Sequence, residues 1–276
     1  MLTTNHPGRA CYALLLLIAV QLTPWAWAED DSTPAQQLAR TPSKSRIFVR
    51  ELEGTWIAKP YLEALKASRA PHAAARKTPA LAIKIQREGQ SYPILTTNFQ
   101  SAVLQFLLDV EPALKPGAYR LVTAPEDRAI SSSEVTYINF RASRGAGDKV
   151  EELAIAEPKF ARGKYVTFVR LPDTLDVTVN RLVIAGRYKD EQGSAYEFTE
   201  SGDAVLPDRK FAYEISLDPR SAPCELLQSH REREPQGSER IGFDWRDATL
   251  RLFAVKPAGK DRYSCEAKPF AVLTPA

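Results

Sequence analysis

Few side chains in this sequence are placed to perform catalysis. Beyond residue 28 there are two histidines, His72 in an alanine-rich stretch and His230 in a charged one, and their spacing does not require a metal site. The sequence also lacks G-x-S-x-G, H-E-x-x-H, G-x-G-x-x-G and the Walker loop, which position a nucleophile, a zinc ion or a nucleotide. We therefore expect both histidines in solvated loops, no bound metal and no cofactor.

Paired carboxylates are the other route to acid–base chemistry, because a glycosidase needs only two of them. The sequence has 34 acidic residues, so acids close in sequence arise by chance on the solvent-facing sides of strands. A carboxylate-based hydrolase is therefore the last of three functional hypotheses. The pairs that would serve it are Asp109/Glu111, Glu197/Glu200 and Asp244/Asp247.

Aromatic residues give the stronger functional signal. They recur in segments that alternate like β-strands, and in a barrel too wide for its own side chains to fill, part of such an interior becomes a pocket for a small ligand. The same residues would equally form the core of a packed barrel, so both interpretations stay open here. The candidate ligand-binding residues are Tyr137, Phe168, Tyr188, Tyr196, Phe198 and Tyr213.

The elements that must hold these residues begin behind an N-terminal export signal. A short start with Arg9 and no acid leads into an apolar run that ends in Ala26-Trp27-Ala28, the A-x-A pattern of a cleavage site. Residues 1–28 are therefore predicted to be a cleaved signal peptide, with an uncleaved anchor as the alternative. The polar residues 29–47 read as a flexible leader. We expect export to the periplasm or the extracellular space.

Charge and cysteine content narrow the class of protein further. The net charge of +3 comes without a long basic stripe, so no nucleic-acid partner is expected, and no segment after the signal would make a stable membrane span. Of three cysteines, Cys11 lies in the signal, which leaves Cys224 and Cys265. An even count in an exported chain predicts a disulfide between these two.

Hydrophobic periodicity predicts a mainly β fold with one or two short helices. Residues 60–69 are the clearest helix, since Pro60 suits its first turn and Leu62 and Leu65 share a face. We expect Pro71 to end it. Further on, about thirteen short alternating segments are joined by Gly- and Pro-containing turns, which is typical of an antiparallel barrel or sandwich.

One β-barrel-like domain over residues 48–276 accounts for this pattern, and a division into two β units would fall near 171–183. Residues 173–185 are consistent with either of two structures. Asp173 could cap a short helix that gives way to a strand near Val183, whereas the β-branched run 177–179 favours a strand throughout.

The triplet Gly54-Thr55-Trp56, placed before a many-stranded chain, resembles the start of the lipocalin-like (calycin) barrels. That resemblance implies that Trp56 lies at the closed end of a barrel, where Gly54 lets the backbone pass. It also implies that a late arginine, Arg251 or Arg262, packs over the indole. The hairpin segment 186–217 is similar to uncharacterised exported bacterial proteins of lipocalin-like type.

The function expected from these observations is non-catalytic. The first hypothesis is an exported β-barrel protein that binds a small apolar or amphipathic molecule. The second is an envelope or surface module with a packed barrel, whose partner is an envelope protein. A ligand cavity lined by Tyr and Phe would favour the first, and an exposed apolar patch over a filled interior would favour the second.

Overall fold

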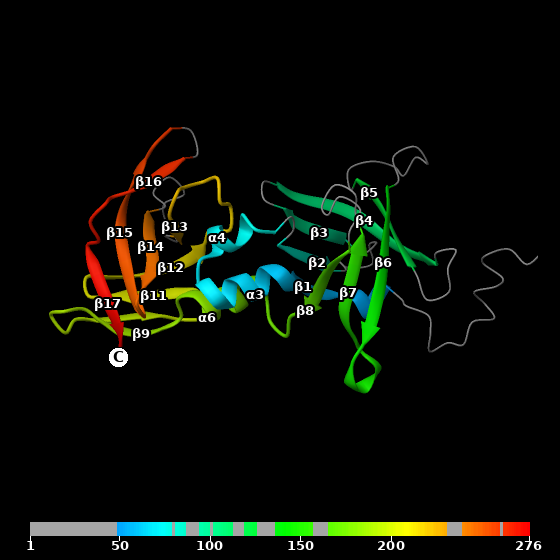
Figure 1. The fold of residues 1–276 in the computed structure, drawn as a ribbon, viewed down its shortest axis with the longest axis horizontal. Coiled ribbons are helices and arrows are strands. Elements are labelled where there is room, and N and C mark those ends of the chain that lie inside the picture. The colour runs from blue at the N-terminus through cyan, green and yellow to red at the C-terminus, as the bar shows by residue number, and fades with distance from the viewer. Residues whose placement is uncertain are drawn as a thin grey trace, which may run out of the picture. The chain divides into compact units, whose positions relative to one another are not determined.

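The computed structural model describes residues 49–78, 81–86, 94–99, 102–112, 119–125, 136–156, 165–230, 239–259 and 262–276 (Figure 1). The predicted signal peptide and leader lie outside these residues. The fold is mainly β, and it contains a closed antiparallel barrel, as the sequence predicts. No helix within the described ranges is long and apolar enough to cross a membrane.

The first closed sheet is an eight-stranded barrel in which every neighbouring pair is antiparallel. Its ring is completed by β1 and β8, where Trp56 faces Arg170 and Ala58 faces Phe168. The turn between β6 and β7 holds a 3-10 helix, Ala146–Asp148. The strands are β1 Gly54–Ala58, β2 Ala82–Gln86, β3 Ile94–Phe99, β4 Ala102–Pro112, β5 Tyr119–Pro125, β6 Thr136–Arg144, β7 Val150–Ala156 and β8 Val166–Arg170.

Trp56 seals one end of this barrel, as the resemblance implies, but its cationic partner is Arg170. The indole is fully buried and donates from Nε1 to the carbonyl of Leu52 at 2.8 Å, in the short helix α2 (Val49–Leu52). The guanidinium of Arg170 lies 4.3 Å from the centre of the Trp56 ring. The expectation that Arg251 or Arg262 would stack there is therefore wrong, because the barrel's last strand ends at residue 170.

Gly54 has a φ of +137°, which a residue with a side chain rarely adopts. A Cβ built there would lie 3.0 Å from Nη1 of Arg170. Glycine thus allows the first strand to pass under the arginine that covers Trp56. Arg251 instead pairs with Asp244, and Arg262 is exposed.

Two helices follow β1 directly. The predicted helix is α3, Lys59–Ser68, with Pro60 in its first turn and with Tyr61 and Leu65 buried, while Leu62 is half-buried. Arg69 ends α3 in a left-handed conformation. Pro71 then begins a second helix, α4, Pro71–Ala75, which the sequence analysis did not anticipate.

The remaining strands form a second antiparallel sheet, which also closes on itself. Successive pairings run from β9 through β15, and β15 then pairs with β17 and β17 with β9. These eight pairings make a ring, to whose β15 the short β16 is added. The strands are β9 Gly186–Lys189, β10 Ala195–Phe198, β11 Asp203–Leu206, β12 Arg209–Ile215, β13 Glu225–His230, β14 Arg240–Arg246, β15 Thr249–Pro257, β16 Tyr263–Cys265 and β17 Ala271–Pro275.

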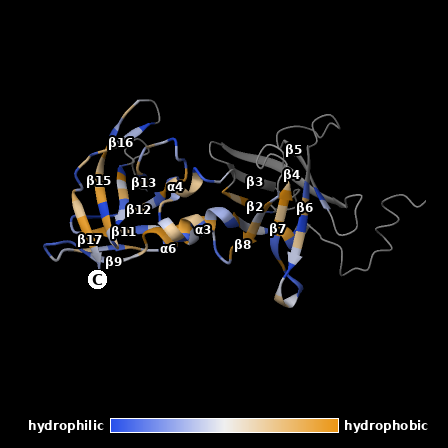
Figure 2. Cartoon of the chain, viewed as in Figure 1, coloured by the Kyte–Doolittle hydropathy of each residue, from blue (hydrophilic) through white to orange (hydrophobic). Residues whose placement is uncertain are grey.

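The two segments that carry the lipocalin-like resemblance therefore lie in different closed sheets. Gly54 and Trp56 belong to the first, and the hairpins of 186–217 belong to the second. The described residues form more strands than the thirteen or so expected, because strands such as β11 and β17 did not stand out in the sequence. Figure 2 shows hydrophobic residues interspersed with hydrophilic ones along β15, the alternation on which the strand prediction depended.

The ambiguous segment before β9 is a helix, α6, Leu175–Val183. Thr174 is its N-cap, since Thr174 Oγ1 accepts from the backbone of Val177 at 3.3 Å. Three hydrogen bonds attach the helix and the residue after it to one end of the second closed sheet, which we call the sealed end. They are Trp245 Nε1 to Val183 O at 2.8 Å, Tyr188 OH to Ile184 O at 2.7 Å, and Asn180 Nδ2 to Glu200 O at 3.0 Å.

The predicted disulfide between Cys224 and Cys265 is present and links β16 to the residue before β13. It crosses directly over Gly242 in β14. A Cβ added at Gly242 would clash with Cys265 Sγ, so the bridge is placed where β14 has no side chain.

Candidate functional site

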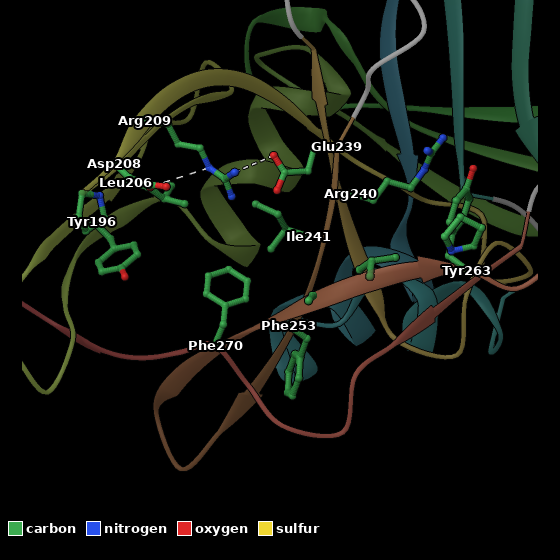
Figure 3. Close-up of a pocket in the computed structure, with 14 residues that line it drawn as sticks. Tyr196, Leu206, Asp208, Arg209, Glu239, Arg240, Ile241, Phe253, Tyr263 and Phe270 are labelled. Atoms are coloured by element: carbon green, nitrogen blue, oxygen red, sulfur yellow. Dashed lines mark hydrogen bonds and ion pairs between the residues drawn. The ribbon is translucent and has the colours of Figure 1, made fainter.

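A pocket of about 650 Å³ lies at the end of the second closed sheet opposite α6 (Figure 3). We call this the open end. It is formed by the ends of β11 and β15, the starts of β10, β12 and β14, and the segment before β17. The sealed end is formed by the opposite ends of the same strands. The second closed sheet therefore has one end covered by α6 and one end that is accessible.

Most of the pocket lining is apolar and aromatic. Four side chains are largely buried: Tyr196, Leu206, Ile241 and Phe253. Phe270 is different, because 49% of it is exposed although it lines the same pocket. An apolar surface that is partly uncovered at a concave site is the usual setting for a small ligand.

An ion pair lies at the open end beside this apolar surface. Arg209 begins β12 on the face that carries Tyr213 and Ile215, and Glu239 precedes β14 on the face that carries Ile241. Strand alternation therefore directs both side chains inward at the rim. Arg209 Nη1 lies 2.8 Å from Glu239 Oε2, as the dashed line in Figure 3 shows, and both side chains are about one-third exposed.

A second arginine lines the pocket without a carboxylate. The guanidinium of Arg240 lies 4.0 Å from the centre of the Tyr263 ring. Among the residues that the structure describes, its side chain has no hydrogen bond or ion pair. The pocket thus combines aromatic surface with two guanidinium groups and the acids Asp208 and Glu239.

Of the predicted ligand-binding residues whose side chains the structure describes, Tyr196 alone lines this pocket. Tyr188, Phe198 and Tyr213 lie in the packed core of the second sheet, where Phe198 makes edge-on contacts with both tyrosine rings at 6.1 and 5.7 Å. Tyr188 OH donates to Ile184 O and Tyr213 OH to Thr199 O, so neither hydroxyl is free for a ligand. Burial also raises the pKa of both tyrosines. These three rings are therefore core residues and do not line this pocket.

The other two predicted residues belong to the first closed sheet. Phe168 is buried on β8, opposite Ala58 and Leu153. Tyr137 lies on β6 opposite Val122, and its side chain is outside what the structure describes.

His72 is not a solvated loop residue, contrary to expectation. It is fully buried in α4, and burial is the main reason that its pKa falls to about 4. Its backbone N–H and that of Ala73 donate to the carboxylate of Glu225 at 2.6 and 3.2 Å, which anchors α4 to β13. Burial raises the pKa of Glu225. These contacts position helices and do not open onto the 650 Å³ pocket. The side chain of His230 lies outside the described residues.

The acidic pairs do not converge on a common centre in the described parts of the chain. Glu197 pairs with Arg187, Glu200 with Arg181 and Asp244 with Arg251. Asp247 lies in the β14–β15 turn with a positive φ. Asp109 and Glu111 lie on β4, where side chains are not described. No group of three or more metal-ligating side chains occurs among the residues described.

A second cavity of about 420 Å³ lies beside the disulfide, between α3–α4 and β13–β15. Its arginines are engaged, since Arg69 lies 4.5 Å from the ring centre of Trp245 and Arg76 donates to the carbonyls of Pro219 and Ala222. The pocket at the open end is therefore the better candidate site.

Sequence reasoning did not identify Arg209, Glu239 or Phe270. The two charged residues had a usable signal, because each continues the alternation of apolar residues in the strand it begins. No family model, curated protein or solved structure matches this chain.

Proposed function

We propose that this chain is an exported, non-catalytic protein that binds a small, partly apolar molecule at the open end of its second closed sheet. One observation carries the proposal: α6 covers one end of the second closed sheet, and a 650 Å³ pocket lined by aromatic residues lies at the other end. Packed proteins retain few voids of that size, so an open apolar pocket favours a ligand.

The arrangement around Trp56 supports lipocalin-like architecture for the first closed sheet. A buried tryptophan on the first strand, covered by an arginine from the last strand of the same barrel, is the pairing that the resemblance implies. In this chain, however, the pocket that supports ligand binding is formed by the second closed sheet.

Export is supported by two features that are independent of each other. Residues 1–28 have the pattern of a signal peptide. Cys224 and Cys265 form a disulfide, and disulfides persist mainly in oxidising compartments. The periplasm or the extracellular space is thus the proposed location.

Binding of the neutral fluorescent probe N-phenyl-1-naphthylamine tests the proposal. We expect saturable binding of one probe per chain, weakened about tenfold or more by Phe270→Ser. Tyr165→Ser is the matched control, because Tyr165 is a similarly exposed aromatic residue (44%) that directly precedes β8 in the first closed sheet. Both variants should keep the melting temperature of the parent.

The result that would overturn ligand binding is an absence of saturable probe uptake, or uptake that Phe270→Ser leaves unchanged. The second hypothesis, a protein-interaction module, has the exposure of Phe270 in its favour. It predicts that Phe270→Ser abolishes capture of a protein partner from the exported fraction while no small probe binds.

A further inference from the structure

We propose that the ligand of the open-end pocket is an amphipathic anion, whose acidic group binds Arg209 in place of Glu239 while its apolar body lies against Ile241 and Phe270. This inference rests on the proposed function and adds the chemical class of the ligand. It is carried by the position and bonding of the two arginines in the pocket.

Arg209 has unused donor capacity in an inward position. Of its five N–H groups, one makes the hydrogen bond to Glu239. Its Nε is buried and has no hydrogen-bond partner in the described structure, and the carboxylate oxygen of Asp208 is 4.0 Å away from it. A guanidinium with free donors beside an apolar wall is suited to a carboxylate or another planar oxyanion, which it can bind through two N–H groups.

Glu239 occupies the position that such an anion would take. Its Oε2 lies on Arg209 Nη1, and its backbone N–H donates to Ser229 Oγ at 3.0 Å. The Glu239 side chain is 37% exposed, so it can turn to solvent at small cost when another anion replaces it. The resident pair would then keep the arginine charge compensated while the pocket is empty.

The charges favour an anionic ligand over a cationic one. An ammonium group would need Glu239 or Asp208, but both acids already lie next to the Arg209 guanidinium. Arg240, by contrast, has no carboxylate partner among the described residues and lies over the ring of Tyr263 on the same lining. The buried side-chain atom of the described pocket lining that lacks a partner, Arg209 Nε, is thus a donor, and donors select for acceptors.

Three ligands with the same ten-carbon chain test the inference: decanoate, decanol and decyltrimethylammonium, each used to displace N-phenyl-1-naphthylamine from the full chain. We expect decanoate to displace the probe at about one-tenth of the decanol concentration, a difference that corresponds to about 1.4 kcal/mol. Arg209→Met should bring decanoate to the level of decanol. Glu239→Gln should strengthen decanoate and leave decanol unchanged, because the competing carboxylate is gone.

Two further variants keep the test interpretable. Arg187→Met removes another Arg–Glu ion pair of the same sheet, on exposed positions of β9 and β10, and should not change the preference for decanoate. The double variant Arg209→Met/Glu239→Gln leaves no uncompensated charge, so loss of the preference there cannot be attributed to a disturbed rim. Melting temperatures confirm that each variant is folded.

Equal potency of the three ligands in the parent protein would overturn the anion inference and leave the proposed function standing, as would a decanoate preference that survives Arg209→Met. Strongest displacement by the ammonium compound would also overturn it, since Glu239 would then be the ligand's partner. Failure of the neutral probe to bind would overturn the proposed function itself.

Discussion

Replacing Arg170 should destabilise the first closed sheet more than any exposed charge does. Its guanidinium donates from Nε to Val150 O at 2.9 Å and from its two terminal nitrogens to the carbonyls of Glu53 and Glu51. It also covers the fully buried ring of Trp56. A single side chain thus joins α2, the start of β1 and the start of β7 at the end that Trp56 seals.

The magnitude follows from these contacts. Each hydrogen bond from a charged donor is worth about 1 kcal/mol after discounting for partial exposure, and the cation–π contact about 1 kcal/mol. Arg170→Met should therefore lower the free energy of unfolding by about 4 kcal/mol. Arg170→Lys keeps the charge but cannot reach three carbonyls at once, so we expect about half of that loss. Trp56→Ala should cost about 3–5 kcal/mol, as for other buried large aromatics.

Urea unfolding followed by tryptophan fluorescence measures the losses at Arg170, and far-UV circular dichroism measures the loss at Trp56→Ala, which removes the fluorescent residue. Past residue 28 the chain has two tryptophans, Trp56 in the first closed sheet and Trp245 in the second. In a Trp245→Phe background without residues 1–28, the fluorescence therefore reports on the surroundings of Trp56 in the first closed sheet alone. Arg187→Met is the control, because its ion pair is mostly exposed and should be worth under about 1 kcal/mol. A loss at Arg170→Met no larger than at Arg187→Met would refute this account of the seal.

Two other substitutions test the second sheet and the α4 anchor. Gly242→Ala should cost about 1–3 kcal/mol, because its Cβ would meet Cys265 Sγ, and the penalty should shrink in a Cys224→Ala/Cys265→Ala background; an equal penalty in both would contradict the steric reason. The pKa of His72 is lowered to about 4 from 6.5, so the unfolded chain binds its proton first and stability should fall as pH drops from 6.5 towards 4, by up to about 3 kcal/mol. Glu225, with its raised pKa, opposes the loss at the lower end of that range, and a His72→Leu variant whose pH dependence equals that of the parent would disprove the assignment.

Local signals in the sequence predicted the parts of the fold that depend on near neighbours. Pro60 and the spacing of Leu62 and Leu65 predicted α3, in which Leu65 is buried and Leu62 half-buried. Two cysteines behind a predicted export signal predicted the disulfide. The ambiguity at 173–185 was resolved by tertiary contacts. Packing of Val179 and Val183 against the core outweighs the strand preference of the β-branched run.

Closure of the sheets was beyond such signals, because it depends on strands far apart in sequence. β17 pairs with β9, where Thr274 lies opposite Lys189, and no local sequence pattern predicts which strand β17 pairs with. The same reason explains the misplaced arginine. The resemblance points to a late residue, but which residue is last in the first barrel depends on where that barrel closes, and it closes at Arg170.

The aromatic candidates show a second limit of periodicity. Alternation correctly places Tyr213 on the inner face of β12, and it places Arg209 on that face too. The face alone does not tell which end of the strand is packed and which is open. That depends on where α6 packs. Trp245 Nε1 donates to Val183 O in α6 and Tyr188 OH donates to Ile184 O just after it, so the helix covers the sealed end and leaves the first residues of β12 and β14 uncovered.

A closed sheet therefore restricts where this protein can recognise another molecule. Ladder pairing occupies the backbone groups that an open sheet edge would offer, apart from those on the free side of β16. We therefore propose that recognition occurs at an end of the ring. In the second sheet the sealed end is filled by aromatic rings whose polar atoms are bonded, whereas the open end presents an aromatic wall and an arginine with spare donors. The difference between these two ends is the physical reason to look for the ligand at Arg209 rather than among the tyrosines of the core.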